Sequence, residues 1–318
     1  MTIAVDSMPD PAPDSFSDVV DEICAANEDL LRGRRKQRGR HALPSRTAVA
    51  ALADDLRSVL FPGHFGAIDL APASIRYYVG AQLDKLQIAL TEQVRRGLWL
   101  ACEHDGVTGS GECRDCDRQA AEVTEALVLR LPAIRRMLEA DLKAAYASDP
   151  AATFLDETLY CYPGILAITH HRIAHELHLH SVPLIPRIIS ELAHAATGID
   201  IHPGAQIGPY FFIDHGTGVV IGETCRIGAR VSLFQGVTLG ARGFSVGPSG
   251  FLKKGQPRHP IIEDDVVIYA GATVLGRVTI GAGAVIGGNV WLTRDVPPGS
   301  RVTQARPQDD TFEDGSGI

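Results

Sequence analysis

The sequence of 318 residues contains no run of about 18 consecutive apolar residues, the length that a membrane-spanning helix requires. Its first 18 residues are acidic and lack the basic segment followed by an apolar segment that marks a secretory signal. Its six cysteines are too sparse for a disulfide-stabilised scaffold. A net charge of −8 disfavours a general nucleic-acid-binding protein. These absences favour a cytoplasmic protein that binds neither membranes nor nucleic acids.

The composition itself is that of a globular protein, with 45% hydrophobic and 21% charged residues, and the length suggests about two domains. The first domain is predicted to be α-helical, because apolar residues recur at three- and four-residue spacings between good helix formers. Pro132, inside the fourth helical segment, is expected to start or kink a helix. The predicted helices span residues 17–31, 46–60, 74–102, 118–146, 162–178 and 184–196.

From Ile201 onward, aliphatic residues recur every six positions, often followed by glycine. This spacing is the hexapeptide repeat of a parallel β-helix, in which three repeats form a triangular coil of about 18 residues. Each aliphatic residue points into the prism, and stacked coils bury one continuous core. The aliphatic positions are Ile201, Ile207, Ile213, Ile221, Ile227, Leu233, Leu239, Ile262, Ile268, Val274, Ile280, Ile286 and Leu292.

The repeat is broken at two places. Two extra residues lie between Ile213 and Ile221, and residues 240–260, with five glycines, are predicted to form an extruded loop. We expect the function to lie at such departures from a regular scaffold. The sequence therefore divides into a flexible N-terminus (1–15), a helical domain (16–198), a β-helix (199–303) and a flexible tail (304–318).

Polar residues gather at the two breaks. Asp214 and His215 occupy the first break, and Arg258 and His259 end the second. Asp200 precedes His215 by nearly one coil, so the two are expected to stack close together on adjacent coils. A histidine beside an orienting carboxylate can take the proton from a substrate hydroxyl. A single histidine here would be read as a surface residue, but the clustering favours a site.

Residues 142–307 resemble bacterial and plant serine O-acetyltransferases. The resemblance implies an α+β chain, with an α-helical N-terminal domain followed by a left-handed parallel β-helix. It depends on motifs more specific than the repeat: Ser-Asp-Pro-Ala (148–151), Arg-Ile-Ala-His (172–175), Asp-Ile-His-Pro (200–203), Ile-Asp-His-Gly-Thr-Gly (213–218), Ile-Gly-Glu-Thr (221–224), Gly-Val-Thr-Leu-Gly (236–240) and Arg-His-Pro (258–260).

The resemblance also implies a mechanism. His215 would act as general base on the hydroxyl of L-serine, with Asp200 orienting it, and the alkoxide would attack the thioester of acetyl-CoA. The products would be O-acetyl-L-serine, the first intermediate of cysteine biosynthesis, and CoA. No metal is required for this chemistry.

The same resemblance assigns the binding of both substrates. Asp149 and Asp214 would hold the serine ammonium group, Arg258 would pair with the carboxylate, and His259 would line the same pocket. A guanidinium suits a carboxylate because it presents two parallel donors.

Small residues would let CoA approach the backbone between coils. These residues are Gly240, Ala241, Ala270 and Gly288. The sequence departs from many family members at Ala241 and at Tyr269, which stand where glycine is more usual. Tyr269 is expected to put an aromatic ring near the CoA cleft.

Family resemblance further implies trimers, often paired into hexamers, with the substrate pockets between neighbouring subunits. L-cysteine is expected to compete with serine as a feedback inhibitor. The polar, acidic tail 308–318 ends in Ile318 and is similar to tails that dock in cysteine synthase (O-acetylserine sulfhydrylase). A terminal apolar side chain with its carboxylate suits capture by a small pocket.

Cysteine and histidine residues outside these motifs suggest weaker hypotheses. Cys102, His104, Cys113 and Cys116 have spacings similar to a zinc-ligand set, with reduced thiols or a redox-sensitive pair as the alternatives. Five histidines lie within residues 170–180, and a packed or surface helix face explains them better than a metal site does. The basic run 32–40 is expected to be a solvated turn.

Three alternative functions remain open from the sequence. A hexapeptide acetyltransferase for a sugar or antibiotic would not need Asp149 and Arg258 to hold the two charges of an amino acid. A metal-dependent hydratase of the γ-carbonic anhydrase type would need His202, His215 and His259 to converge on zinc. A non-catalytic partner of cysteine synthase would use only the tail.

Overall fold

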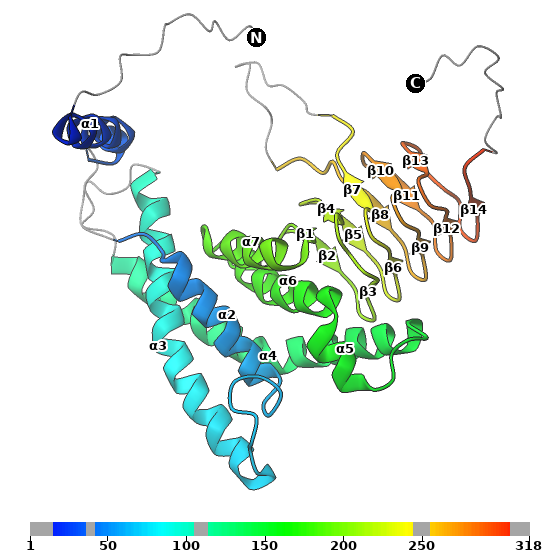
Figure 1. The fold of residues 1–318 in the computed structure, drawn as a ribbon, viewed down its shortest axis with the longest axis horizontal. Helices are drawn as coiled ribbons and strands as arrows, with labels where there is room; N and C mark the ends of the chain where they lie inside the picture. Colours follow the sequence, from blue (N-terminus) through cyan, green and yellow to red (C-terminus); the bar gives the residue numbers. More distant parts are fainter. Residues whose placement is uncertain (1–14, 36–41, 105–113, 244–254, 306–318) are drawn as a thin grey trace, which may run out of the picture.

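The computed structural model describes residues 15–35, 42–104, 114–243 and 255–305; within these ranges the side chains of residues 28–35, 103, 104 and 114 are not described. A set of helices precedes a prism of short parallel strands (Figure 1). Residues 1–14 of the predicted N-terminus (1–15), most of loop 240–260 and residues 306–318 of the predicted tail (304–318) lie outside the described residues. The helices are α1 (Phe16–Arg35), α2 (Arg46–Leu60), α3 (Pro72–His104), α4 (Arg114–Ser148), α5 (Leu155–Cys161), α6 (Pro163–Leu179) and α7 (Ile185–Thr197).

Two long helices, α3 and α4, dominate the helical region and pack against each other. The expectation that Pro132 starts a helix is wrong, because α4 begins upstream at Arg114 and continues past it. The short helix α5 was not predicted, since seven residues are too few for a periodic pattern. None of the described helices combines the length and the apolar character that a bilayer crossing requires.

A buried ion pair connects the helical region to the prism. Arg172 on α6 donates to Asp141 on α4, with an Nε–Oδ2 distance of 2.6 Å, and to the backbone oxygens of Ile207 and Gly208 on the first coil. Asp141 also accepts the backbone N–H of Phe211 at 2.9 Å. Because both charged side chains are buried, their mutual pairing fixes how α4 and α6 lie against the first coil.

The prism is a left-handed parallel β-helix with three sheets, one on each face. Their strand orders are β1-β4-β7-β10-β13, β11-β8-β5-β2 and β14-β12-β9-β6-β3. The strands are β1 (Asp200–Ile201), β2 (Gln206–Ile207), β3 (Phe212–Ile213), β4 (Val220–Ile221), β5 (Arg226–Ile227), β6 (Ser232–Leu233), β7 (Thr238–Gly240), β8 (Ile261–Ile262), β9 (Val267–Ile268), β10 (Thr273–Leu275), β11 (Thr279–Ile280), β12 (Val285–Ile286), β13 (Trp291–Leu292) and β14 (Arg301–Val302).

The predicted inward positions of the repeat are confirmed. All thirteen aliphatic residues are buried, none with more than 9% of its surface exposed. In every strand except β3 the residue before the aliphatic one is more exposed than the aliphatic residue, as the pleat requires; in β3 Phe212 is buried as well. Each buried aliphatic side chain contributes about 1.5–3 kcal/mol, so the column of stacked residues is the main source of stability in the prism.

Coil length varies along the prism, and this affects the expected positions of Asp200 and His215 relative to each other. Residues of β8 lie opposite residues of β11 that are 18 positions later, as the repeat predicts. In the first coil the two inserted residues lengthen the separation, and Asp200 lies opposite Val220. Asp200 and His215 therefore do not share a register position: Asp200 pairs with Val220, and His215 lies in the corner that precedes β4, next to Gly216, which packs on Ile199.

Candidate active site

His215 lies in a tight turn at the corner between β3 and β4. Its backbone is left-handed, with φ of +54°, and Gly216 and Gly218 on either side of Thr217 also have positive φ. A Cβ on Gly216 would overlap the side chain of Ile199, so only glycine fits there. The turn leaves 73% of the His215 side chain exposed. A strained, exposed histidine held by a rigid scaffold is typical of a functional position.

Acidic side chains surround His215. Its Nε2 atom lies 3.7 Å from Oδ2 of Asp214. Asp149, just beyond α4, accepts the O–H of Tyr162 on Oδ2 and the N–H of Ala151 on Oδ1 at 2.8 Å. These bonds, with a smaller effect from His215, lower the pKa of Asp149, and the same contact raises the pKa of Tyr162 to about 12. Asp149 is therefore ionised and Tyr162 neutral at pH 7.

This corner has the chemistry to bind a primary ammonium group beside a base. Asp149 and Asp214 supply negative charge, and His215 supplies a ring nitrogen. Tyr162, which sequence reasoning missed, holds Asp149 in place from the residue before α6. No local pattern marks Tyr162, because its partner lies 13 residues away.

Asp200 lies close to this turn but has different contacts. The turn residue Gly216 lies over Ile199, the neighbour of Asp200. The Asp200 carboxylate is 3.9 Å from the guanidinium of Arg187. One carboxylate oxygen of Asp200, one of Glu191 and a ring nitrogen of His194 all lie within 4.8 Å of one another. Among the described residues, no hydrogen bond or ion pair within 4.0 Å joins Asp200 to His215. Arg187 already supplies a positive charge to this acidic cluster.

A second group of predicted residues lies at the corner that follows β4. Thr224 organises it: its Oγ1 accepts the backbone N–H groups of Arg258 at 2.9 Å and His259 at 3.1 Å. Arg277 donates to the backbone oxygens of Thr224 at 2.6 Å and His259 at 2.9 Å. Arg258 is paired with Glu223, with an Nη2–Oε2 distance of 2.7 Å. The sequence identified Glu223 and Thr224 only as parts of a motif. It did not predict that Glu223 pairs with Arg258 or that Thr224 organises this corner.

His259 is buried and neutral in this corner. Only 6% of its surface is exposed, and its ring lies where a Cβ on Gly222 would be. Burial, with the adjacent Arg258 charge, lowers the pKa of His259 to about 4. The corner thus combines a cationic guanidinium with a neutral imidazole, which suits a carboxylate.

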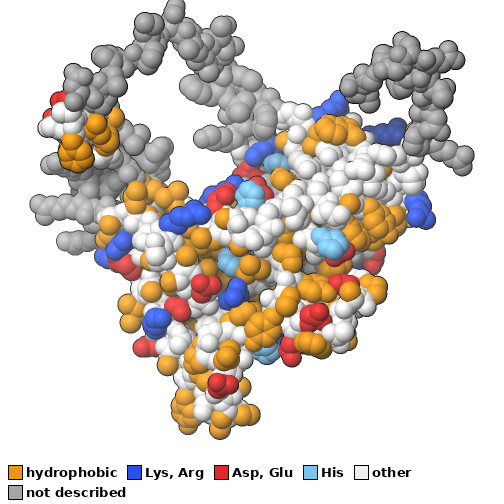
Figure 2. All heavy atoms as spheres, viewed as in Figure 1, with side chains coloured by type: hydrophobic (Ala, Val, Ile, Leu, Met, Phe, Trp, Pro, Cys, Tyr) orange, Lys and Arg blue, Asp and Glu red, His pale blue; other side chains and the backbone are white. Residues whose placement is uncertain are grey.

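The two groups lie at opposite edges of one prism face. His215 precedes β4 and Glu223 follows it, so the face formed by β4 separates them. His202 shares the corner of His259, whereas His215 does not, so one chain does not bring the three together as the hydratase alternative needs. In Figure 2, histidines lie among acidic and basic side chains where the helices meet the prism.

The predicted CoA-facing residues also divide between these corners. Gly240 ends β7 and Ala241 follows it, on the side of Arg258. Ala270 and Gly288 follow β9 and β12, on the side of His215. Tyr269 stacks on Phe234, with ring centroids 4.9 Å apart and planes inclined by 22°. The ring of Tyr269, which was expected near the CoA cleft, is therefore held in place by Phe234. Nothing in the sequence indicated this role for Phe234.

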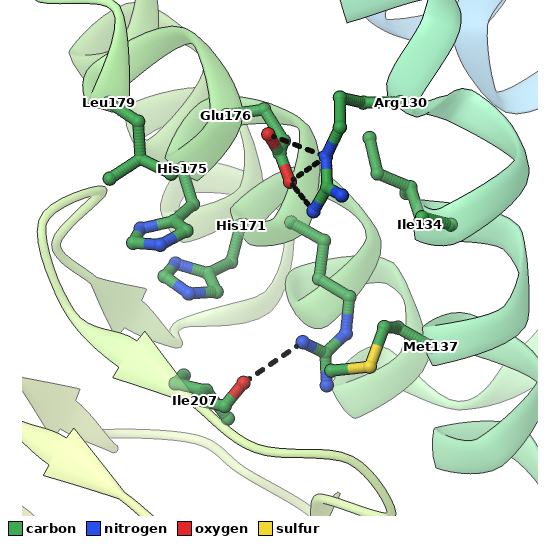
Figure 3. Close-up of a pocket in the computed structure, with 10 residues that line it drawn as sticks. Arg130, Ile134, Met137, His171, His175, Glu176, Leu179 and Ile207 are labelled. Carbon is green, nitrogen blue, oxygen red and sulfur yellow. Dashed lines mark hydrogen bonds and ion pairs between the residues drawn. The ribbon is translucent and has the colours of Figure 1, made fainter.

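A separate cavity of about 210 Å³ lies between α4, α6 and β2 (Figure 3). His171 and His175 line it side by side from α6, with ring centroids 5.6 Å apart. Arg130 and Glu176, 2.8 Å apart, form another part of its wall. None of the predicted catalytic or substrate residues lines this cavity. Within the histidine-rich segment, His170 and His171 are buried on α6, whereas His180 is exposed just beyond its end.

The predicted zinc candidates are only partly described. The sulfurs of Cys102 and Cys116 lie 3.4 Å apart, where the end of α3 approaches the start of α4. The side chain of His104 and all of Cys113 lie outside the described residues.

Comparisons of sequence and of structure with known proteins lead to the same kind of enzyme. Residues 259–294 match the family model described as bacterial transferase hexapeptide (six repeats). A plasmid-encoded serine acetyltransferase from Synechococcus elongatus is 52% identical over 300 residues, which cover 94% of each chain. Serine acetyltransferase 1 of Entamoeba histolytica, solved in complex with L-cysteine, has a TM-score of 0.68 and 36% identity over 83% of this chain and 88% of its own. The Neisseria gonorrhoeae serine acetyltransferase, solved with serine, has a TM-score of 0.52 and 28% identity over 81% of this chain and 96% of its own.

Proposed function

The chain belongs to the serine acetyltransferase family, and on this premise we propose that His215 is its general base. The enzyme is an acyltransferase, with acetyl-CoA as acetyl donor and L-serine as acceptor. The Nε2 atom of His215 takes the proton from the serine hydroxyl, and the serine oxygen attacks the thioester carbon. The carbon–sulfur bond then breaks, and the imidazolium returns the proton to the CoA sulfur. A positioned base accelerates such a step by about 10²–10⁴-fold.

The observation that best supports this role is the gathering of Asp149, Tyr162 and Asp214 around an exposed His215. Asp149 and Asp214 bind the serine ammonium group and thereby place the hydroxyl near the ring. Asp200 orients His215 from the neighbouring coil; the packing of Gly216 on Ile199 puts the two residues on adjoining stretches of chain. In this arrangement Asp149 and Asp214 bind the substrate and Asp200 orients the imidazole of His215. Only that imidazole transfers a proton.

Arg258 binds the serine carboxylate, and His259 donates its Nε2–H to the same group. Because these residues lie at the other edge of the β4 face, a neighbouring copy of the chain completes each site. We therefore propose a homotrimer with its sites between subunits, with or without pairing of two trimers through the helices. A closed ring of identical interfaces gives each subunit one complete site.

CoA lies along the same intersubunit cleft. Gly240 and Ala241 from one subunit, and Ala270 and Gly288 from its neighbour, let the pantetheine arm approach the backbone. Tyr269, stacked on Phe234, forms an aromatic wall beside Ala270. Because acetyl-CoA is an intracellular metabolite, the proposal places the reaction in the cytoplasm, as the first step of cysteine synthesis.

L-cysteine inhibits the enzyme by taking the place of serine. It carries the same ammonium and carboxylate groups, and a relative of similar fold has been solved with L-cysteine bound. Calorimetry should show that saturating serine abolishes cysteine binding. Independent binding of the two amino acids would contradict this proposal.

The tail that ends in Ile318 binds cysteine synthase through its terminal side chain and carboxylate. Deleting residues 308–318 should abolish binding to cysteine synthase and leave acetyl transfer intact. A truncated chain that still binds would refute the tail's role.

The decisive experiment measures CoA thiol release from acetyl-CoA, with and without L-serine. We expect release to depend on serine and to fall by about 10²–10⁴-fold in His215→Ala. His180→Ala, at the exposed end of α6, is the matched control. Release that survives His215→Ala would exclude His215 as the base.

A further inference from the structure

We propose that Cys102 and Cys116 are a modification site, where a small oxidant converts two thiols into a reversible disulfide bond between α3 and α4. Cys102 lies in the last turn of α3, and Cys116 lies in the first turn of α4. The bond needs only these two residues, and the side chains of both are described. Acetyl transfer uses neither thiol, so this site is separate from the proposed active site on the prism.

The two sulfurs are already in contact. They lie 3.4 Å apart, as a pair of thiols in which either sulfur can donate to the other. A disulfide bond is about 2.05 Å long, so the sulfurs must approach by about 1.4 Å. Rotation about the Cα–Cβ bonds, together with fraying at the two helix ends, supplies a shift of this size. The bond can therefore form while the rest of the two helices stays packed.

The packing of α3 against α4 keeps the two thiols together. Thr91 and Thr124 bond to each other at 3.0 Å. Nearer the cysteines, Arg95 on α3 lies 3.7 Å from Asp117 on α4. Because these contacts hold the thiols side by side, each has a high effective concentration towards the other. That proximity favours a bond within the chain over a mixed disulfide with a small thiol.

The remaining cysteines with described side chains have different surroundings. Cys24 and Cys161 are exposed. Cys225 is buried inside the prism, where burial raises its pKa to about 12 and keeps it in the unreactive protonated form. Among the cysteines with described side chains, only Cys102 and Cys116 make a sulfur–sulfur contact. An oxidant should therefore treat this pair differently from the other three.

The unequal exposure of the two thiols sets the order of the reaction. Cys102 is half-buried, whereas only 3% of the surface of Cys116 is exposed. A low-molecular-weight disulfide, the oxidant of this proposal, therefore reaches Cys102 first. The Cys102 thiolate attacks one sulfur of the small disulfide, whose S–S bond breaks, and one small thiolate leaves.

The second step closes the bond within the chain. The Cys116 thiolate attacks the Cys102 sulfur and releases the second small thiolate. Each cysteine has then lost one proton, and each released thiolate has taken one up. Two electrons have passed from the cysteine pair to the small disulfide, so the chain is oxidised and the small disulfide is reduced to two thiols.

The bond changes the stability of the helical region. It closes a loop from residue 102 to residue 116, and such a cross-link stabilises a protein mainly by restricting its unfolded chain. The two helices that it joins are the long helices α3 and α4, which pack against each other. The stability of this region therefore follows the thiol–disulfide balance of the surroundings.

The first experiment uses the unsubstituted full chain, reduced and then incubated with glutathione disulfide. We expect peptide mapping to recover a pair of peptides joined through Cys102 and Cys116, while the exposed Cys24 and Cys161 carry glutathione. The oxidised chain should unfold at a higher temperature, and dithiothreitol should reverse both changes. Two thiols that stay reduced, a joined pair that contains a different cysteine, or glutathione that remains on Cys102 would each overturn the proposal.

Two serine variants test the order of attack. Cys116→Ser lacks the thiol for the second step, so Cys102 should retain one glutathione. In Cys102→Ser, the buried Cys116 should react with glutathione disulfide about 10-fold more slowly than Cys102 reacts in the other variant. Cys161→Ser is the matched control and should form the bond between Cys102 and Cys116 as the unsubstituted chain does. Equal reaction rates at the two cysteines would refute Cys102 as the site of first attack.

Discussion

The backbone N–H of Thr224 donates a hydrogen bond of 3.0 Å to Nδ1 of His259. A ring nitrogen that accepts a hydrogen bond is unprotonated, so the neutral imidazole carries its proton on Nε2. Because its pKa is lowered to about 4, His259 is a neutral donor at pH 7. His259 can therefore donate to an oxygen of the substrate, while Arg258 and Arg277 supply the positive charge at this corner.

Gly222→Ala should disturb this arrangement directly. The new methyl group would overlap the His259 ring, which has no alternative space in a buried corner. The ring must shift, and we expect kcat/KM for serine to fall by about 10- to 100-fold. Gly80→Ala on α3 is the control, because a Cβ there meets no atom within 4 Å. Steady-state kinetics on both variants checks this, and equal behaviour of the two would contradict it.

His259 should also make the protein sensitive to acid. Its pKa is about 4 in the folded chain and about 6.5 in the unfolded chain, so between these values the unfolded chain binds more protons. Stability that is present at pH 7 is therefore lost as the pH falls from about 6.5 towards 4. In His259→Gln the melting temperature should fall less steeply over this window. Glutamine keeps an acceptor for the Thr224 N–H, so an unchanged slope would show that His259 contributes nothing.

Tyr162→Phe should weaken serine binding more than it slows the reaction. Without the phenol O–H, Asp149 loses the donor that positions its carboxylate and contributes most to its lowered pKa. We expect KM for serine to rise several-fold with kcat largely retained. Tyr160→Phe, which loses a 2.7 Å bond to the backbone oxygen of His64, is the matched control. A fall in kcat at unchanged KM would instead place Tyr162 in the chemical step.

Asp141→Asn should be strongly destabilising. It leaves the Arg172 guanidinium buried without its counter-charge, and breaking such a pair costs about 3–5 kcal/mol. The midpoint of denaturant unfolding should fall accordingly. Glu139→Gln, which removes an exposed pair with Lys143, should leave the midpoint nearly unchanged. The double variant Asp141→Leu/Arg172→Met should lose less stability than the two single variants together, and additivity would contradict the coupling.

The fold was predictable because every coil repeats the same physical requirement. An aliphatic residue must point inward at each sixth position, and all thirteen such residues are buried. The two inserted residues marked the break after Ile213 but not its effect on register. Only the structure shows that the longer coil puts Val220, and not His215, opposite Asp200.

The supporting residues of the site were less visible in the sequence. Tyr162 and Asp149 are 13 residues apart in the sequence, and Thr224 and His259 are 35 apart. A local pattern of residues therefore cannot predict either contact. The roles of His215 and Arg258 were suggested by motifs, which mark chemistry but not distance. That the two motifs lie on opposite edges of a prism face follows only from the strand order.

A mixture of two inactive variants should recover activity if the site is shared between subunits. His215→Ala removes the proposed base from one corner, and Arg258→Ala removes the proposed ligand of the serine carboxylate from the other. When the two chains are unfolded together and reassembled at equal concentrations, about one quarter of the interfaces combine an intact His215 with an intact Arg258. We therefore expect about one quarter of the wild-type activity from the mixture, measured as serine-dependent CoA release.

The control is a sample in which the two variants are mixed only after each has been assembled separately. Each variant reassembled alone, and the two combined only after reassembly, should stay inactive as long as subunits do not exchange. If both residues served one site within a single chain, every site in the mixture would carry one of the two defects, and no activity would return. Recovery in the co-assembled sample alone thus requires that His215 of one subunit works with Arg258 of another, which is the arrangement of the proposed trimer.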